Sequence, residues 1–272
     1  MPFITTDDGT DLFYSDWGKG DQVVVFVHAW GLSSKQWQYQ LRDFIAQGFR
    51  CITYDKRGHG RSDQSGGGYD HDTLADDLAT LIQTLDLQGV NLIGHSFGCG
   101  QVVRYVTRHG RDRVDRAVLL APCLPLLLKT PDNEDGWDLT LVDANVDLLA
   151  QDVPKWCEVT APSYFGSAPH NLGGLVDWTC REIIDTPLPV LLETLRSNAC
   201  SDFRSELPGF DVPTLILHGD ADTSAPIQLT SQKTAPLLPE CTFITYPEAG
   251  HGFYASEHPQ VNRDILAFLA KT

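Results

Sequence analysis

Short runs of apolar residues alternate with amphipathic segments through most of the chain. A run that is apolar at nearly every position predicts a strand buried on both faces, whereas helical spacing of apolar residues predicts a helix packed on one side. Strands are expected at 22–27, 50–54, 90–95, 116–121, 212–218 and 242–246. Helices are expected at 34–47, 71–87, 98–109 and 261–269. This alternation predicts the α/β class, with a mostly parallel central sheet flanked by helices on both faces.

The segment from 124 to 205 interrupts this pattern, because it contains no apolar run typical of a core strand. Apolar residues there recur at helical spacing over 139–149 and 173–184. A stretch of roughly 80 residues between two sheet elements is more typical of an insertion than of an independent domain. We therefore expect residues 1–123 and 206–272 to form the α/β core and residues 124–205 to form a helical cap or lid.

The net charge of the chain argues against some classes of binding partner. The 272 residues include 20 Lys and Arg and 36 Asp and Glu, which gives a formal net charge of −16. Such acidity argues against nucleic acid and against an anionic membrane surface as partners, because both attract a basic face. No stretch reaches the ~18–20 apolar residues that a membrane helix needs, and residues 1–8 do not resemble a signal peptide. The chain is therefore expected in the cytoplasm.

The spacing of cysteine and histidine residues does not indicate a metal site. The seven cysteines are scattered without a CxxC motif, which argues against a zinc site and against a redox dithiol. The nine histidines form no HExxH motif, and no GxGxxG follows a predicted strand. We therefore expect free thiols and a protein that needs neither a metal nor an organic cofactor.

Residues 94–98, with the sequence Gly-His-Ser-Phe-Gly, are the clearest chemical signal in the chain. They follow the predicted strand 90–95 and precede the predicted helix 98–109, which is the context of a nucleophile elbow. On such a turn the serine has a strained backbone conformation and is exposed above the sheet edge. Gly94 and Gly98 have no side chains, which lets the strand and the helix pack closely. Ser96 is therefore the predicted nucleophile.

A serine hydroxyl is a weak nucleophile unless a base activates it. His251 is the candidate base, because it lies in a glycine-flanked loop between the last predicted strand and the last predicted helix. The acid that orients this base is expected after the strand 212–218, where Asp220 and Asp222 are both available. The other location considered, residues 122–124, contains no carboxylate. The order Ser, Asp, His along the chain is that of one class of serine hydrolases.

These motifs resemble those of the α/β-hydrolase superfamily, and in particular of its bacterial arylesterase and cofactor-free haloperoxidase group. The resemblance implies an α/β-hydrolase fold with a helical cap. It also implies that Asp222, the second Asp of HGDAD, is the acid of a catalytic triad. The backbone N–H groups of Trp30 and Phe97 would then form the oxyanion hole. The matching segments cover nearly the whole chain outside the insertion: DGTDLFYSDWGKG, VVVFVHAWGLSSKQW, YDKRGHGRSD, NLIGHSFGCG, LILHGDADTSAP and EAGHGF.

The resemblance implies a serine hydrolase of the carboxylesterase or arylesterase type, which acts on a small ester or lactone through an acyl-enzyme. The same residues would serve a cofactor-free haloperoxidase or perhydrolase, in which peroxide replaces water, or a lactonase or γ-lactamase. A non-catalytic hydrolase-like binding protein is disfavoured, because Ser96, Asp222 and His251 are all present. The oligomeric state stays open, and a homo-oligomer is compatible with the sequence.

Aromatic side chains are expected around the substrate. Phe97 stands where the resembled group usually has Met or Leu. Its larger ring is therefore expected to point toward the substrate and to favour short acyl groups, from acetate to butyrate. Further aromatic residues are expected to line the pocket, although the four in the insertion could instead form its own core: Trp137, Trp156, Phe165, Trp178 and Phe253.

Overall fold

The structure, a computed structural model, describes residues 2–166 and 173–270. Its centre is an eight-stranded sheet with the order β1-β2-β4-β3-β5-β6-β7-β8. The first two strands are antiparallel to their neighbours and the other six run parallel, so the prediction of a mostly parallel sheet is confirmed. The strands are β1 (Phe3–Thr5), β2 (Asp11–Trp17), β3 (Val23–Val27), β4 (Arg50–Tyr54), β5 (Val90–His95), β6 (Val114–Leu120), β7 (Thr214–Gly219) and β8 (Cys241–Tyr246).

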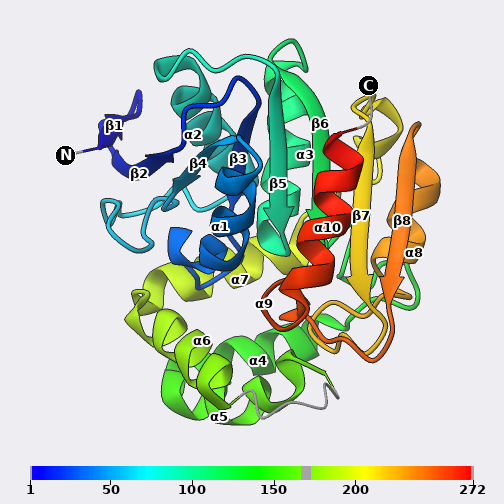
Figure 1. Ribbon diagram of the computed structural model, residues 1–272. Helices are drawn as coiled ribbons and strands as arrows, with labels where there is room; N and C mark the ends of the chain where they lie inside the picture. The colour runs from blue at the N-terminus through cyan, green and yellow to red at the C-terminus, as the bar shows by residue number, and fades with distance from the viewer. Residues whose placement is uncertain (1, 167–172, 271–272) are drawn as a thin grey trace.

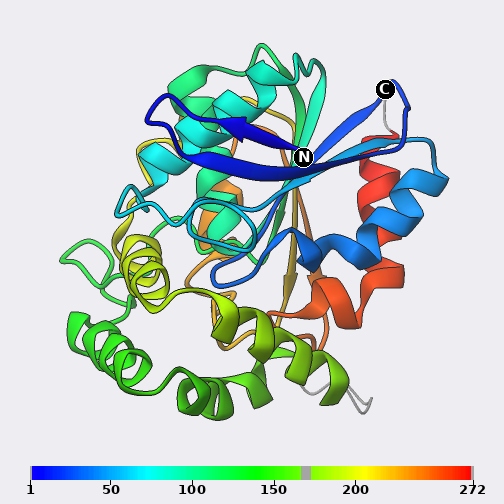
Figure 2. The same cartoon turned by 90° about the vertical axis from the view of Figure 1, so that its left-hand side faces the viewer.

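Helices cover both faces of the sheet (Figures 1 and 2). On one face α1 (Gln38–Ala46) packs against α10 (His258–Leu269), and on the other α2 (His71–Thr84) packs against α3 (Phe97–His109). Every residue of β3 is buried. Val25 belongs to the apolar cluster on the α2–α3 side, whereas Val24 and Phe26 belong to the cluster on the α1–α10 side. Burial on both faces explains why β3 has no polar positions in alternation.

The two antiparallel strands are absent from the sequence-based prediction. β1 has only three residues, and β2 carries polar residues and is partly exposed along much of its length. A strand at a sheet edge buries only part of its surface, so its apolar signal is weak. The remaining short helical turns are η1 (Ser34–Trp37), η2 (Leu207–Gly209), η3 (Ala235–Leu237), α8 (Ser231–Thr234) and α9 (Phe253–Ser256).

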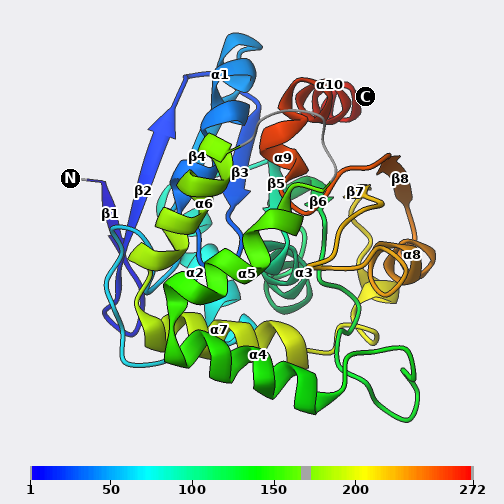
Figure 3. The ribbon, with the colours of Figure 1, turned by 90° about the horizontal axis from the view of Figure 1, so that it is seen from below.

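Helices α4 (Leu139–Gln151), α5 (Val153–Tyr164), α6 (Gly173–Asp185) and α7 (Leu188–Cys200) lie between β6 and β7, and we call them the cap. They lie across the carboxyl ends of the parallel strands (Figures 1 and 3). The sequence predicts α4 and α6 but not α5 and α7. Both missed helices have a proline in their first turn, where proline is well tolerated although it suggests a break in the chain. The cap limits of 124 and 205 remain a prediction.

The turn between β5 and α3 holds Ser96 in a backbone conformation that L-amino acids rarely adopt, with φ 55° and ψ −119°. The space around this turn requires glycine on both sides. A methyl group at Gly98 would lie 2.4 Å from the carbonyl oxygen of Val27, and one at Gly94 would lie 2.9 Å from the carbonyl oxygen of Gly98. Close packing of α3 against β3 and β5 therefore keeps Ser96 at the carboxyl end of β5 and at the amino terminus of α3.

This packing predicts that Gly98→Ala destabilises the protein. Alanine normally favours a helix over glycine by about 1 kcal/mol, but here its methyl group would collide with backbone atoms of β3. We expect the free energy of unfolding to fall by about 1–3 kcal/mol, as in other overpacked sites. Urea denaturation measures the change. Gly67→Ala is the control, because nothing lies within 4 Å of its added methyl group. Equal stability of the two variants would contradict this account.

Candidate active site

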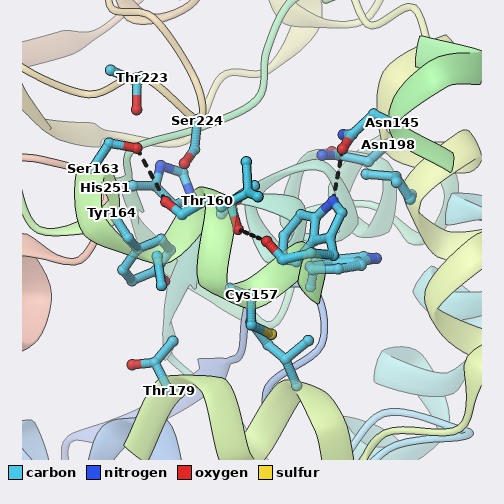
Figure 4. A pocket seen from close by; sticks show the side chains of 18 of the residues that line it. Asn145, Cys157, Thr160, Ser163, Tyr164, Thr179, Asn198, Thr223, Ser224 and His251 are labelled. Carbon is cyan, nitrogen blue, oxygen red and sulfur yellow. Dashed lines mark hydrogen bonds between the residues drawn. The ribbon is translucent and has the colours of Figure 1, made fainter. Parts of the chain in front are cut away.

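A cavity of about 620 Å³, which we call the cap cavity, lies between the cap and the carboxyl ends of the strands (Figure 4). Its polar side-chain groups are hydroxyls, carboxamides, thiols, indole N–H groups and one imidazole. Within the described parts of the chain, no Lys, Arg, Asp or Glu lines it. The cap cavity is therefore an apolar chamber with neutral hydrogen-bonding groups. Its apolar wall from the cap includes Leu141, Val142, Leu148, Trp156, Val159, Val176, Ile183 and Leu195.

Ser96 and His251 both line the cap cavity, as sequence reasoning places them at one site. The Ser96 hydroxyl makes its hydrogen bond with Cys123 Sγ, at 3.4 Å, rather than with the His251 imidazole. Rotation about the Cα–Cβ bond of Ser96 redirects this hydroxyl. Catalytic hydrogen bonds often form only once a substrate is bound, so the arrangement is compatible with a serine–histidine pair.

His251 and Asp222 form a short hydrogen bond, with 2.6 Å between His251 Nδ1 and Asp222 Oδ2. His251 lies in the loop after β8, and Asp222 lies in the loop after β7. An ionised carboxylate only accepts hydrogen bonds, so Nδ1 of His251 carries the proton. The second ring nitrogen, Nε2, is thereby left as a proton acceptor, which is the form that a general base requires.

The Asp222 carboxylate is buried, and both of its oxygens accept hydrogen bonds. Its Oδ1 accepts hydrogen bonds from the backbone N–H groups of Ser224 and Ala225, both at 2.8 Å, and its Oδ2 also accepts one from His218 Nε2 at 3.0 Å. Burial alone would raise the pKa of Asp222, but electrostatic attraction to His251 and the hydrogen bonds of the two histidines outweigh it and hold the pKa below its ordinary value. Asp222 is therefore a stable anion beside His251.

His218 is a site residue that sequence reasoning misses. Its Nδ1 lies 2.6 Å from Ser231 Oγ, and its Nε2 donates to Asp222. The available signal is its position four residues before Asp222, at the end of the strand that precedes the acid. Asp220 has a different role, because its Oδ1 accepts a hydrogen bond from the backbone N–H of Glu248 at 2.6 Å. The structure thus brings Asp222, and not Asp220, to the imidazole.

The backbone N–H groups of Trp30 and Phe97 come from the loop after β3 and the first residue of α3. In the part of the chain that the structure describes, neither N–H donates to a protein acceptor. The Trp30 indole is itself fixed, because its Nε1 donates to the Leu191 carbonyl at 3.0 Å. This is compatible with the predicted oxyanion hole, which remains a prediction.

Three of the five aromatic residues expected at the pocket line the cap cavity, namely Trp137, Trp156 and Phe165. Trp156 donates its indole N–H to Asn145 Oδ1 at 2.7 Å (Figure 4), which satisfies its one polar atom. Its ring lies 5.1 Å from that of Trp30, measured between centroids. These aromatic side chains form a continuous wall of the cap cavity, from the cap to the loop after β3 that carries Trp30.

The expectation is wrong for Trp178 and Phe253, which do not line the cap cavity. Thr179 and Ile183 form the inner face of α6, and Trp178 precedes Thr179 by one position, which turns it about 100° away on a helix. Phe253 is fully buried and its ring packs 5.1 Å from that of Tyr246, in the core beneath the site. Proximity to His251 in sequence therefore does not place Phe253 at the substrate.

The Phe97 ring also differs from the expectation, because it points away from the cap cavity. It is fully buried and lies 4.6 Å from the His71 ring of α2. Phe97 is the first residue of α3, and its ring lies on the side of α3 that packs against α2 rather than on the side that faces the cap. Phe97 therefore does not narrow the cap cavity, and its position gives no reason to expect a preference for short acyl groups.

No group of three or more His, Cys, Asp or Glu side chains within residues 2–166 and 173–270 is arranged to hold a metal ion. The independence from metals and cofactors remains a prediction. In the same residues, no helix combines the length and apolar character needed to cross a membrane.

The chain belongs to the family described as the alpha/beta hydrolase fold, whose family model matches residues 22–257. It is 37% identical over 276 residues to the non-heme chloroperoxidase CPO-A1 of Kitasatospora aureofaciens, with 100% of each chain covered. It is 36% identical over 275 residues to the bifunctional esterase/perhydrolase DCH of Acinetobacter calcoaceticus, with 99% of each covered. The solved structure of the esterase EaEST from Exiguobacterium antarcticum matches with a TM-score of 0.94 at 28% identity, covering 99% of each chain. The predicted fold and family resemblance are confirmed.

The geometry predicts a large difference between two neighbouring carboxylates. Asp222→Asn is expected to lower kcat for p-nitrophenyl butyrate by about 10³-fold or more, because an amide N–H facing His251 favours the wrong imidazole tautomer. Asp220→Asn keeps a carbonyl acceptor for the Glu248 N–H and is expected to stay within about threefold of wild type. Circular dichroism verifies that both variants fold. Equal kcat values, or the reverse order, would show that the wrong carboxylate is assigned.

Proposed function

We propose that the protein is a serine hydrolase that cleaves small neutral carboxylic esters or lactones through an acyl-enzyme on Ser96. One observation carries this proposal: a serine on a strained turn and a histidine hydrogen-bonded to a buried aspartate open onto the same cavity. A strained serine of this kind is typical of a nucleophile rather than of a structural residue. Asp222, His251 and Ser96 have the roles of acid, base and nucleophile.

In the first half of the reaction, Ser96 Oγ attacks the ester carbonyl carbon while His251 Nε2 accepts its proton. Asp222 stabilises the resulting imidazolium through the 2.6 Å hydrogen bond. The free N–H groups of Trp30 and Phe97 donate to the carbonyl oxygen as it gains negative charge, a contribution of about 3–4 kcal/mol for each donor. The tetrahedral intermediate collapses when His251 returns the proton to the leaving alcohol. In a lactone, that alcohol stays attached to the acyl group.

In the second half, a nucleophile attacks the acyl carbon and His251 accepts its proton, after which Ser96 leaves as the alcohol. Water gives a carboxylic acid. Hydrogen peroxide in the same position gives a peroxycarboxylic acid, so the alternative function is perhydrolysis, with halide oxidation by the peracid as its consequence. The relatives favour this alternative as strongly as hydrolysis, since their names include a chloroperoxidase and an esterase/perhydrolase. Both functions need the same acyl-enzyme.

The cap cavity supports neutral substrates. Its described lining carries no Lys, Arg, Asp or Glu, and the chain as a whole has a net charge of −16. A carboxylate or ammonium group carried by the substrate would lose its hydration without gaining an opposite charge, which costs several kcal/mol. The hydroxyls of Thr160 and Ser163 donate to the backbone carbonyls of Trp156 and Thr160, so toward a substrate they can act as hydrogen-bond acceptors.

Loss of the nucleophile is the test of the proposed function. Ser96→Ala is expected to lower kcat for p-nitrophenyl butyrate by at least about 10³-fold, and to abolish peracid formation from the same ester and hydrogen peroxide. Both rates are measured at one enzyme concentration, with circular dichroism as the control for folding. A folded variant that keeps more than about a tenth of either wild-type rate would contradict the shared acyl-enzyme.

A matched pair of esters tests the preference for neutral substrates. p-Nitrophenyl hexanoate and the mono-p-nitrophenyl ester of adipate differ only in a terminal methyl group against a carboxylate. The charged ester is expected to have a kcat/KM lower by about 100-fold or more, because its carboxylate is buried without a partner. Alkaline hydrolysis of the two esters without enzyme is the control for intrinsic reactivity. Values within about threefold of each other would show that the acyl chain does not enter the cap cavity.

A further inference from the structure

A chain of buried hydrogen bonds runs through the side chains of Gln36 and His95. The backbone N–H of Ala29 donates to Gln36 Oε1 at 2.9 Å, and Gln36 Nε2 lies 2.9 Å from His95 Nδ1. His95 Nε2 in turn lies 3.1 Å from the backbone carbonyl oxygen of His251. Two side chains thus connect the loop after β3, the end of β5 and the loop after β8.

Only one arrangement of protons satisfies this chain. The Ala29 N–H can only donate and the His251 carbonyl can only accept, so both ends are set by the backbone. Gln36 must therefore present its oxygen to Ala29 and its NH₂ group to His95. His95 Nδ1 then accepts, and its Nε2–H donates to the His251 carbonyl. The chain selects a single neutral tautomer of His95.

Water cannot replace these partners, because Gln36 and His95 are both fully buried. The His95 ring is enclosed by two others, with centroid distances of 4.8 Å to His251 and 4.7 Å to Tyr254. Burial, and the nearby His251, lower the pKa of His95 well below its ordinary value. A neutral ring at this place matters, because a positive charge on His95 would oppose protonation of the neighbouring His251.

This chain of hydrogen bonds ends, on both sides, next to a residue of the proposed catalytic site. Ala29 immediately precedes Trp30, whose N–H is a proposed oxyanion donor. His95 immediately precedes Ser96. His251, the proposed base, is held through its own backbone carbonyl. A change in Gln36 would therefore disturb the donor, the nucleophile and the base together, although its side chain is absent from the lining of the cap cavity.

We propose that Gln36 and His95 are positioning residues. They hold the loop after β3, which carries the Trp30 N–H, and the loop of His251 in fixed positions around Ser96. This inference rests on the proposed function, since it assigns a role within that reaction. Neither side chain touches the reacting atoms. Both act on groups that stabilise the transition state, so their loss affects kcat rather than the binding of substrate.

Gln36→Leu removes both hydrogen bonds and keeps a side chain of similar size. We expect kcat for p-nitrophenyl butyrate to fall by about 10- to 100-fold with KM within about twofold, as for a small misplacement of catalytic groups. Gln101→Leu is the matched control, because Gln101 is also fully buried and donates to the Leu74 carbonyl, away from all three loops. Its kcat is expected to stay near wild type. Equal kcat values for the two variants, or a change confined to KM, would overturn the proposal.

A spectroscopic measurement tests the chain without relying on activity. In ¹⁵N NMR of the wild-type protein, His95 is expected to show a bare Nδ1 and a protonated Nε2 across neutral pH. Gln36→Glu is expected to reverse or abolish this signature and to lower kcat as Gln36→Leu does, because a carboxylate cannot donate to Nδ1. A wild-type His95 that is protonated at Nδ1 would overturn the proposal.

Different results would refute the proposed function and the positioning role of Gln36. Absence of Ser96-dependent turnover in the wild type would refute the proposed function and with it the catalytic role of Gln36, whatever the NMR spectrum. Ser96-dependent turnover together with an unchanged kcat in Gln36→Leu would leave the proposed function standing and refute the positioning role alone.

Discussion

The strained turn at Ser96 is the constraint on which the rest of the site depends. Its positive φ lets the chain leave β5 and enter α3 with almost no connecting loop. That close approach requires glycine at 94 and 98, since a side chain at either position would meet backbone atoms at less than 3 Å. Only a sheet and helix packed this tightly can hold the serine in such a conformation, so the fold stabilises the strain that exposes the hydroxyl.

The other polar groups of the site are arranged around this turn at the carboxyl ends of parallel strands. The loop after β3 brings the Trp30 amide, the loop after β7 brings Asp222, and the loop after β8 brings His251. The Asp222 carboxylate accepts four hydrogen bonds, and the side chains of Gln36 and His95 are hydrogen-bonded at both ends. The cap adds a neutral, mostly apolar chamber above them. The core therefore carries the proposed chemistry and the cap the proposed selectivity.

Local patterns in the sequence predict the parallel strands and the loops that carry Ser96, Asp222 and His251, because these depend on continuous apolar runs and on short motifs. Local patterns do not predict the directions in which individual side chains point. Phe97 and Phe253 flank the site in sequence, but both turn into the core, since packing against His71 and Tyr246 decides where they lie. Trp178 is one helical position from the cavity wall. The pairing of Gln36 with His95 joins residues 59 positions apart, and neither belongs to a motif that indicates the other.

A covalent acyl intermediate on Ser96 is detected most directly by intact-protein mass spectrometry of enzyme quenched in acid during turnover of p-nitrophenyl butyrate. We expect a population that carries one butyryl group, which peptide mapping locates on Ser96 and which hydrogen peroxide depletes as it accepts the acyl group. Turnover without any acylated protein, or acylation at a residue other than Ser96, would contradict this expectation.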